Sequence, residues 1–125
     1  MLRATPPVRF KTEPGRFAHQ DYAYWKISDM VTSWVPFMEI PPLMGGLALR
    51  IGSHRDPPVP LVIPSFKEED WATAHYMPGD VLLFHCLTAH AALPNLTEKV
   101  RMSGDFRWQR ATEPVARELV CGTGE

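Results

Sequence analysis

The chain lacks any long apolar run. No segment reaches the roughly 18 consecutive apolar residues that mark a membrane-spanning helix, so no membrane span is expected. The segment from Met1 to Phe10 also lacks the apolar core of a secretory signal peptide. With a formal net charge of −1, the chain carries no excess of one charge that would attract nucleic acid or an anionic membrane. These absences predict a cytoplasmic protein that has neither membranes nor nucleic acids as partners.

Cysteine is also scarce. The two cysteines, Cys86 and Cys121, show no spacing typical of a disulfide framework. Cys86 falls in an apolar, strand-like run, whereas Cys121 falls in a polar tail. We therefore expect two reduced thiols, as is usual in the cytoplasm, with a long-range disulfide as the alternative.

Proline and glycine, in contrast, are abundant. The 13 prolines and 8 glycines fall between apolar runs, a pattern that favours short strands joined by turns over long helices. Pro78 and Gly79 suit the central positions of a type II turn. We expect strands at 17–25, 31–40, 47–51, 61–63, 81–86 and 100–108, one helical turn or polar loop at 67–74, and a short helix at 113–120.

This pattern of elements predicts one small all-β domain over residues 1–125, with an irregular lead-in at 1–16 and a C-terminal tail at 111–125. Turn signals recur at roughly ten-residue spacing, which is typical of a β-sandwich or barrel. In a jelly roll of two sheets, side chains from distant strands can converge at an interior mouth. The expected fold can therefore bring together metal ligands that lie far apart in the sequence.

A His-x-Asp pair lies in the first expected strand. Because His19 and Asp21 are two residues apart, a strand would point both side chains to one face and Gln20 to the other. Far downstream, His90 follows an apolar run. Two imidazoles and one carboxylate form the ligand set of a non-haem Fe(II) site with open coordination positions. His85 is the competing ligand, but its opposite strand face favours a histidine satisfied by hydrogen bonds or solvent.

Arg101 is the next candidate site residue. It begins the expected strand at 100–108, and a hairpin through the turn at Asn95 would bring it beside the strand that holds His90. Its planar guanidinium suits a carboxylate bound in a partly dry pocket. Other basic residues such as Arg107 lie nearby, so an ordinary surface arginine is the alternative.

The order and spacing of these residues resemble the phytanoyl-CoA dioxygenase family over about residues 15–110. The segments that carry the resemblance are His19-Gln20-Asp21, Trp34-Val35-Pro36-Phe37, Gly45-Gly46-Leu47, Gly52-Ser53-His54, Pro78-Gly79-Asp80, His90 and Arg101. The resemblance implies a double-stranded β-helix, or jelly-roll, fold. Because family members usually carry a longer segment before the ligand strand, it also implies a truncated or minimal core.

The resemblance further implies that Fe(II) is held by His19, Asp21 and His90 and that the co-substrate 2-oxoglutarate is anchored by Arg101. Trp34 matches a tryptophan that lies close to this co-substrate, with a core aromatic as the alternative. The implied reaction is the oxidation of a small-molecule or lipid-like substrate by O₂, most simply a hydroxylation, with release of succinate and CO₂.

Other features keep different functions open. The short length before the ligand strand favours a non-catalytic or degenerate domain of the same family, while the intact ligand set and arginine oppose it. A cupin-like metalloenzyme without 2-oxoglutarate is a third alternative, although such sites usually need more histidines than this chain provides. The family commonly has a small hydroxyl residue where this chain has Ala92. Strand parity also places Trp25 with the ligand pair, as an aromatic wall of the cavity.

Overall fold

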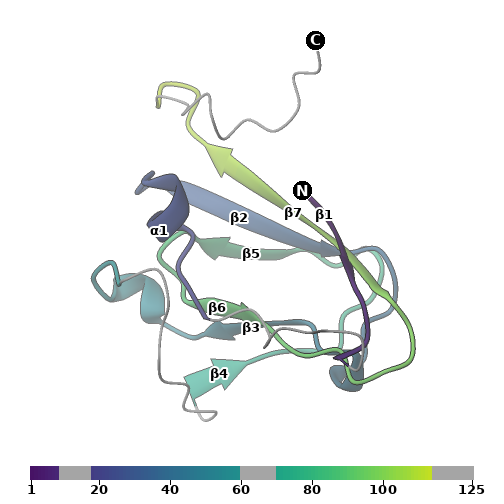
Figure 1. Cartoon of the computed structure of the whole chain (residues 1–125). Helices are drawn as coiled ribbons and strands as arrows, with labels where there is room; N and C mark the ends of the chain where they lie inside the picture. Colours follow the sequence, from purple (N-terminus) through teal and green to yellow (C-terminus); the bar gives the residue numbers. More distant parts are fainter. Residues whose placement is uncertain (9–17, 60–69, 114–125) are drawn as a thin grey trace.

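The chain folds into two stacked antiparallel β-sheets (Figure 1). The computed structural model describes residues 1–8, 18–59 and 70–113. These residues form the strands β1 (Leu2–Thr5), β2 (Met30–Pro36), β3 (Leu47–Arg50), β4 (Trp71–Ala72), β5 (Leu82–His85), β6 (His90–Ala92) and β7 (Arg101–Gln109). The helical segments are α1 (Tyr22–Trp25), η2 (Pro42–Met44) and η3 (Ser53–Arg55). Within the described ranges, no helix is long and apolar enough to cross a bilayer.

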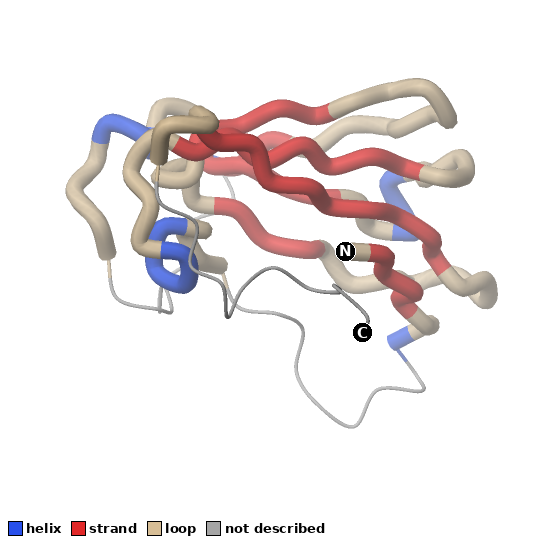
Figure 2. Tube along the Cα trace, turned by 90° about the horizontal axis from the view of Figure 1, so that it is seen from above, coloured by secondary structure: helices blue, strands red, loops and turns tan. Residues whose placement is uncertain are grey.

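The larger sheet has the strand order β1-β7-β2-β5, and the smaller sheet has the order β4-β3-β6. All the strand pairs are antiparallel. In Figure 1 the layer of β7, β2 and β5 lies over the layer of β6, β3 and β4, and the view from above places the helical segments at the ends of strands (Figure 2). Two packed antiparallel sheets of this kind form a jelly roll. The predicted all-β, double-stranded β-helix fold is therefore confirmed.

The hydrophobic core lies between the sheets. Its buried residues are Trp34, Ile40, Met44, Leu47, Tyr76 and Phe84. Trp34 and Tyr76 meet edge to face with ring centroids 4.9 Å apart, and the Tyr76 hydroxyl donates to the Leu47 carbonyl oxygen over 2.7 Å. This bond satisfies a hydroxyl that would otherwise be costly to bury. Because Trp34 and Leu47 also line the central cavity, the core fixes one wall of that cavity.

Several of the expected elements are confirmed. β2, β3, β5 and β7 overlap the strands expected at their positions. Before β5, Gly79 has a φ of +100° and the Asp80 amide donates to the Met77 carbonyl oxygen, as a type II turn requires. The single-domain assignment of the chain stays a prediction. Three further predictions fall outside the described residues: the strand at 61–63, almost all of the helix at 113–120, and the redox state of Cys121.

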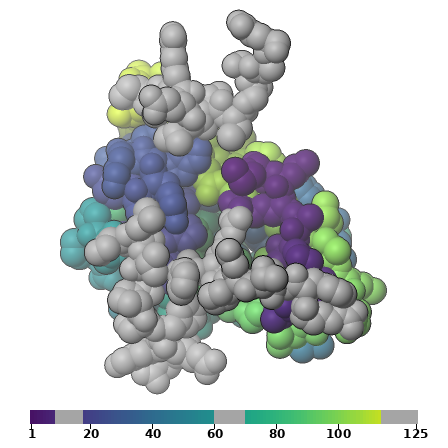
Figure 3. Space-filling view, viewed as in Figure 1, coloured from purple at the N-terminus to yellow at the C-terminus, as the bar shows by residue number. Residues whose placement is uncertain are grey.

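The irregular lead-in predicted at 1–16 is wrong for its first residues, which form β1 and pair with β7. β1 lies at the molecular surface against β7 (Figure 3). Its charge and the neighbouring prolines indicated a loop, but Asp105 neutralises Arg3, and Pro6 comes only after the last residue of the strand. An edge strand can end at a proline without losing a ladder hydrogen bond.

The strand predicted at 17–25 is also wrong. His19 forms only an isolated bridge, and the chain then turns into α1 at Asp21, whose φ of −60° and ψ of −31° are helical. The Tyr22 amide donates to the Cys86 carbonyl oxygen over 3.1 Å. The aromatic residues favoured a strand, but strand preference depends on tertiary contacts of this kind.

Three downstream predictions fail for a related reason. The helical turn or polar loop expected at 67–74 contains β4, which pairs with β3. The strand of β5 does not continue regularly to His90, because the chain turns after β5 and β6 enters the smaller sheet beside β3. The hairpin expected to place Arg101 beside His90 is therefore wrong, since β7 belongs to the larger sheet. Local apolar content indicates strands, but it does not indicate the sheet that each strand joins.

Candidate metal centre

A backbone bridge sets His19 beside His90. The His19 amide donates to the His90 carbonyl oxygen over 3.0 Å, and the His90 amide donates to the His19 carbonyl oxygen over 2.9 Å. Directly opposed residues of an antiparallel pair present their side chains on the same face. The two imidazole rings accordingly lie with their centroids 4.4 Å apart, at an interplanar angle of 58°.

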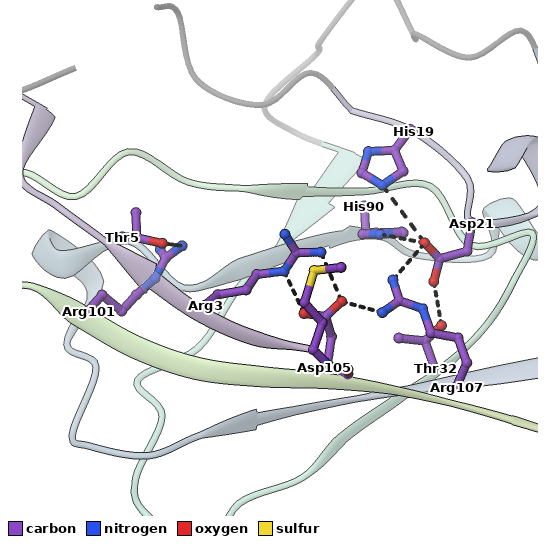
Figure 4. Close-up of polar contacts among 10 residues, drawn as sticks. Arg3, Thr5, His19, Asp21, Thr32, His90, Arg101, Asp105 and Arg107 are labelled. Atoms are coloured by element: carbon purple, nitrogen blue, oxygen red, sulfur yellow. Dashed lines mark hydrogen bonds and ion pairs between the residues drawn. The ribbon is translucent and has the colours of Figure 1, made fainter. Parts of the chain in front are cut away.

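Asp21 completes a cluster of three donors at this bridge (Figure 4). Its Oδ1 atom lies 3.8 Å from His19 Nε2 and 3.6 Å from His90 Nε2. The three donor atoms lie within 4.8 Å of one another, and residues 1–8, 18–59 and 70–113 hold no other such group of His, Cys, Asp or Glu. The structure thus brings together the three residues that the sequence predicted to converge, although the predicted strand parity is not what joins them.

The chemistry of these donors fits a divalent transition metal. Burial lowers the pKa of His90 to about 4, although the nearby Asp21 carboxylate acts in the opposite direction. At neutral pH the imidazole is therefore uncharged, which is the form that binds a metal. Its Nδ1 atom lies 3.0 Å from the Thr88 carbonyl oxygen, so Nδ1–H donates there and Nε2 keeps its lone pair for a ligand bond. Two imidazole nitrogens and one carboxylate oxygen leave further coordination positions open.

Two side chains of the larger sheet hold the Asp21 carboxylate. The Thr32 hydroxyl donates to Asp21 Oδ2, and Arg107 Nη2 donates to Asp21 Oδ1 over 3.2 Å. Burial alone would raise the pKa of Asp21, but the attraction of His90 in its protonated form and of Arg107, together with these hydrogen bonds, lowers the pKa overall. Asp21 is therefore an anion at neutral pH, as a metal-binding carboxylate must be.

Sequence reasoning missed Arg107 and Asp105. Asp105 accepts hydrogen bonds from Arg107 and from Arg3, whose Nη2 lies 2.9 Å from Asp105 Oδ2 (Figure 4). Side chains alternate along β7, so Arg101, Asp105 and Arg107 share its inner face. This alternation could have identified Asp105 and Arg107 from the sequence, because a strand was expected here and Arg101 was already assigned to a pocket.

Arg101 lies apart from the donor cluster, beyond Arg3 and Asp105 in the close-up view (Figure 4). Its side chain is buried; Nη1 donates to the Leu93 carbonyl oxygen over 3.2 Å, and Nη2 donates to the Thr5 hydroxyl over 3.3 Å. Both of these acceptors are uncharged oxygens. At 3% exposure, Arg101 is not the ordinary surface arginine of the alternative interpretation.

Of the remaining candidates, Trp34 lines the cavity, whereas His85 and Trp25 do not. Trp34 is both a core aromatic and a residue of the cavity wall, so its two interpretations are compatible. His85 lies outside the donor cluster, and its Nδ1 accepts a hydrogen bond from the Leu87 amide over 3.2 Å, as expected for a satisfied histidine. Trp25 does not line the cavity as predicted, because it lies in α1 rather than in a strand; its ring centre is 5.6 Å from the Arg107 guanidinium.

A cavity of about 400 Å³ joins the donor cluster to Arg101. This volume falls in the range typical of small-molecule sites. β1 contributes part of its lining. The polar part of the wall includes His19, His90, Arg101, Asp105 and Arg107, and the apolar part includes Trp34, Leu47, Phe84 and Ala92.

The sequence is similar to known oxygenases. The profile of the family described as Phytanoyl-CoA dioxygenase (PhyH) matches residues 7–103. The chain is 32% identical over 134 aligned positions to the 1-deoxypentalenic acid 11-beta-hydroxylase of Streptomyces arenae, and 29% identical to that of Streptomyces exfoliatus. Each alignment covers 89% of this chain and 47% of the relative. The chain therefore spans about half the length of the curated relatives it matches.

Solved structures share the fold. EvdO2 from Micromonospora carbonacea var. aurantiaca superposes with a TM-score of 0.73 at 22% identity, over 94% of this chain and 54% of that protein. The structure of EvdO2 complexed with 2-oxoglutarate gives a TM-score of 0.71. At this level of identity the similarity establishes the fold. The family profile, in turn, matches more than half of the sequence, from residue 7 to residue 103. By that match, the chain belongs to the phytanoyl-CoA dioxygenase family.

Proposed function

We propose that this chain is an Fe(II)- and 2-oxoglutarate-dependent dioxygenase that hydroxylates a small-molecule or lipid-like substrate. The convergence of His19, Asp21 and His90 at one end of a 400 Å³ cavity carries the proposal. Its three donors come from an isolated bridge, the start of α1 and β6, so an accidental cluster would require several unrelated contacts to coincide. We also propose a cytoplasmic location, where thiols such as Cys86 stay reduced.

Each ligand has a defined role in this proposal. His19 and His90 supply neutral imidazole nitrogens, and Asp21 supplies the anionic oxygen that partly balances the charge of the metal. The Thr88 carbonyl fixes the tautomer and the orientation of the His90 ring. With three protein ligands, a divalent transition metal held here would keep further coordination positions for co-substrate and O₂.

Arg101 is the proposed anchor for the distal carboxylate of 2-oxoglutarate. The Leu93 carbonyl and the Thr5 hydroxyl hold its guanidinium in place from the side. A planar guanidinium binds a carboxylate through paired hydrogen bonds, and such bonds are stronger in a buried site than in water. Trp34, fixed by the core, would form the wall beside the co-substrate. These residues position the reactants rather than take part in bond making.

Iron and 2-oxoglutarate, when bound, supply the oxidative chemistry of the reaction. In the overall balance, 2-oxoglutarate loses CO₂ and becomes succinate, which takes one atom of O₂, while the other atom converts a C–H bond of the substrate to C–OH. The apolar wall that includes Leu47 and Phe84 favours a largely apolar substrate. An organic acid, 1-deoxypentalenic acid, is the substrate in the name of the Streptomyces hydroxylases.

Anaerobic binding of Fe(II) and 2-oxoglutarate tests the proposal directly. Chelation of iron by the 2-oxo acid should give a visible metal-to-ligand charge-transfer band in the parent protein. Asp21→Ala and His90→Ala should each abolish this band and the turnover of 2-oxoglutarate to succinate. Full turnover in either purified variant would refute the ligand assignment. If the folded parent protein gives no band, the non-catalytic alternative is favoured instead.

A further inference from the structure

We propose that Thr32 and Arg107 are positioning residues that restrict Asp21 to binding the metal through one oxygen. This inference rests on the proposed function and deepens it. If Asp21 bound through both oxygens, it would take one of the positions that 2-oxoglutarate and O₂ need. The two oxygens of Asp21 have different surroundings, and this difference is the basis of the inference.

The two carboxylate oxygens of Asp21 have different hydrogen-bond and ion-pair partners. Oδ1 is the oxygen that lies 3.8 Å from His19 Nε2 and 3.6 Å from His90 Nε2. Oδ2 accepts the hydrogen bond from the Thr32 hydroxyl. The Thr32 side chain is buried, so water cannot easily replace this bond. Turning Oδ2 toward the imidazoles would break the hydrogen bond and leave the Thr32 hydroxyl buried without it.

Arg107 holds the same carboxylate from a second direction. Thr32 and Arg107 are directly opposite each other in the β2–β7 pair, so their side chains share one face of the sheet and both reach Asp21. Arg107 Nη2 donates to Oδ1 over 3.2 Å. The guanidinium is itself fixed, because Asp105 accepts a hydrogen bond from Nη1 and the ring of Trp25 lies 5.6 Å from it.

The attraction between a metal ion and its ligands does not explain why the Arg107 guanidinium lies beside Asp21. A cation beside a ligand oxygen repels the divalent ion that the ligand must bind. Asp105 reduces that repulsion, since it is a second carboxylate in contact with Arg107 and also pairs with Arg3. The arrangement therefore retains the directional hydrogen bond of Arg107 to Asp21 while limiting the charge that the metal meets. A fixed fork of donors achieves this geometry better than a flexible ammonium group does.

Matched variants separate positioning from folding. Thr32→Val removes the hydroxyl and keeps the β-branched shape, whereas Thr32→Ser keeps the hydroxyl. Arg107→Gln removes the charge and the fork, and Arg107→Lys keeps the charge. Arg110→Gln serves as the control, because the Arg110 side chain is 74% exposed and pairs with Asp29 at the surface. The thermal midpoint of each protein without metal reports any loss of folding stability.

Two anaerobic measurements then test the inference. Fe(II) affinity is measured by competition with a chelating dye, and 2-oxoglutarate affinity is measured at saturating Fe(II) from the charge-transfer band. We expect Thr32→Val and Arg107→Gln to weaken Fe(II) binding by about 10–100-fold, while Thr32→Ser and Arg110→Gln stay within about 2-fold of the parent. At saturating Fe(II), the first two variants should also bind 2-oxoglutarate more weakly and shift the band, and Arg107→Lys should recover part of the loss.

The outcomes distinguish this inference from the proposed function. If the parent protein shows neither Fe(II) binding nor a band, both are overturned. If the parent shows both, but Thr32→Val and Arg107→Gln retain the parent affinities and the parent band, the positioning role alone is wrong. Should Arg107→Gln fail to fold, the comparison of Thr32→Val with the parent decides the question, since threonine and valine have a similar shape and differ only in that a methyl group replaces the hydroxyl.

Discussion

Asp105→Asn is expected to destabilise the fold by about 2–3 kcal/mol at neutral pH. The substitution keeps the shape of the side chain and removes a negative charge that lies between Arg3 and Arg107. The Asp105 side chain is 5% exposed, whereas those of Arg3 and Arg107 are 25% and 17% exposed. Breaking a fully buried pair costs about 3–5 kcal/mol, and the expected loss is smaller because Arg3 can reach solvent and Arg107 keeps its bond to Asp21.

The pH dependence of this effect has a definite sign. Burial alone would raise the pKa of Asp105, but the hydrogen bonds and charges of Arg3 and Arg107 lower it below its value in the unfolded chain. A carboxylate with a depressed pKa contributes stability that is fully present above the unfolded pKa and is lost as the pH falls through the folded pKa. The stability difference between parent and variant should therefore be constant above about pH 5 and shrink below about pH 4.

Urea denaturation followed by tryptophan fluorescence measures the free energy of unfolding. Repeated from about pH 3 to about pH 8, it gives both the loss at neutral pH and the pH dependence of that loss. Asp29→Asn is the matched control, because Asp29 and Arg110 form an exposed surface pair and the change should cost less than about 0.5 kcal/mol. The reasoning would be refuted if Asp105→Asn cost no more than this control at neutral pH. It would also be refuted if the difference persisted unchanged in acid, since the loss would then come from packing rather than charge.

Two further substitutions test the other end of the cavity and the core. Arg101→Gln should weaken 2-oxoglutarate binding by about 2 kcal/mol, or roughly 30-fold, and leave Fe(II) binding unchanged in dye competition. An unchanged 2-oxoglutarate affinity would instead favour the cupin-like alternative, in which this arginine is dispensable. Gly46→Ala should destabilise the fold by about 1–3 kcal/mol in urea, because its Cβ would lie 2.7 Å from Tyr76 Cδ2 in a packed core. A parent-like urea midpoint would show that the Tyr76 ring can move aside.

The strands that could be predicted are those whose local sequence pattern matches their burial in the fold. β5 is an apolar run preceded by a Pro-Gly turn, and β7 alternates between buried and exposed positions over most of its length. β1 and α1 could not be predicted in the same way. β1 is held as a strand by its pairing with β7, where Asp105 also neutralises Arg3, and α1 forms where the Tyr22 amide bonds to the Cys86 carbonyl. Both causes are contacts between distant segments, which local preferences do not contain.

The structure nevertheless brings the three predicted ligands together, although the local structure predicted for them is wrong. A strand from 17 to 25 would have placed His19 and Asp21 on one face by alternation. In the structure, the bridge between His19 and His90 aligns the two imidazoles, and the following turn brings the Asp21 carboxylate back toward them. The chemical requirement for two imidazoles and a carboxylate thus identified residues whose approach depends on long-range backbone bonds.

The alternation of β7 extends the site beyond the residues of the family pattern. Arg101 and Arg107 are both at odd positions of the strand, with Asp105 between them, so one prediction of strand parity places all three toward the cavity. Arg101 begins the strand and Arg107 lies near its other end, beside Asp21. One strand therefore connects the proposed co-substrate anchor to the proposed metal ligand. If Arg107→Gln weakens Fe(II) binding while Arg101→Gln weakens only 2-oxoglutarate binding, the two ends of β7 act separately, as their different partners require.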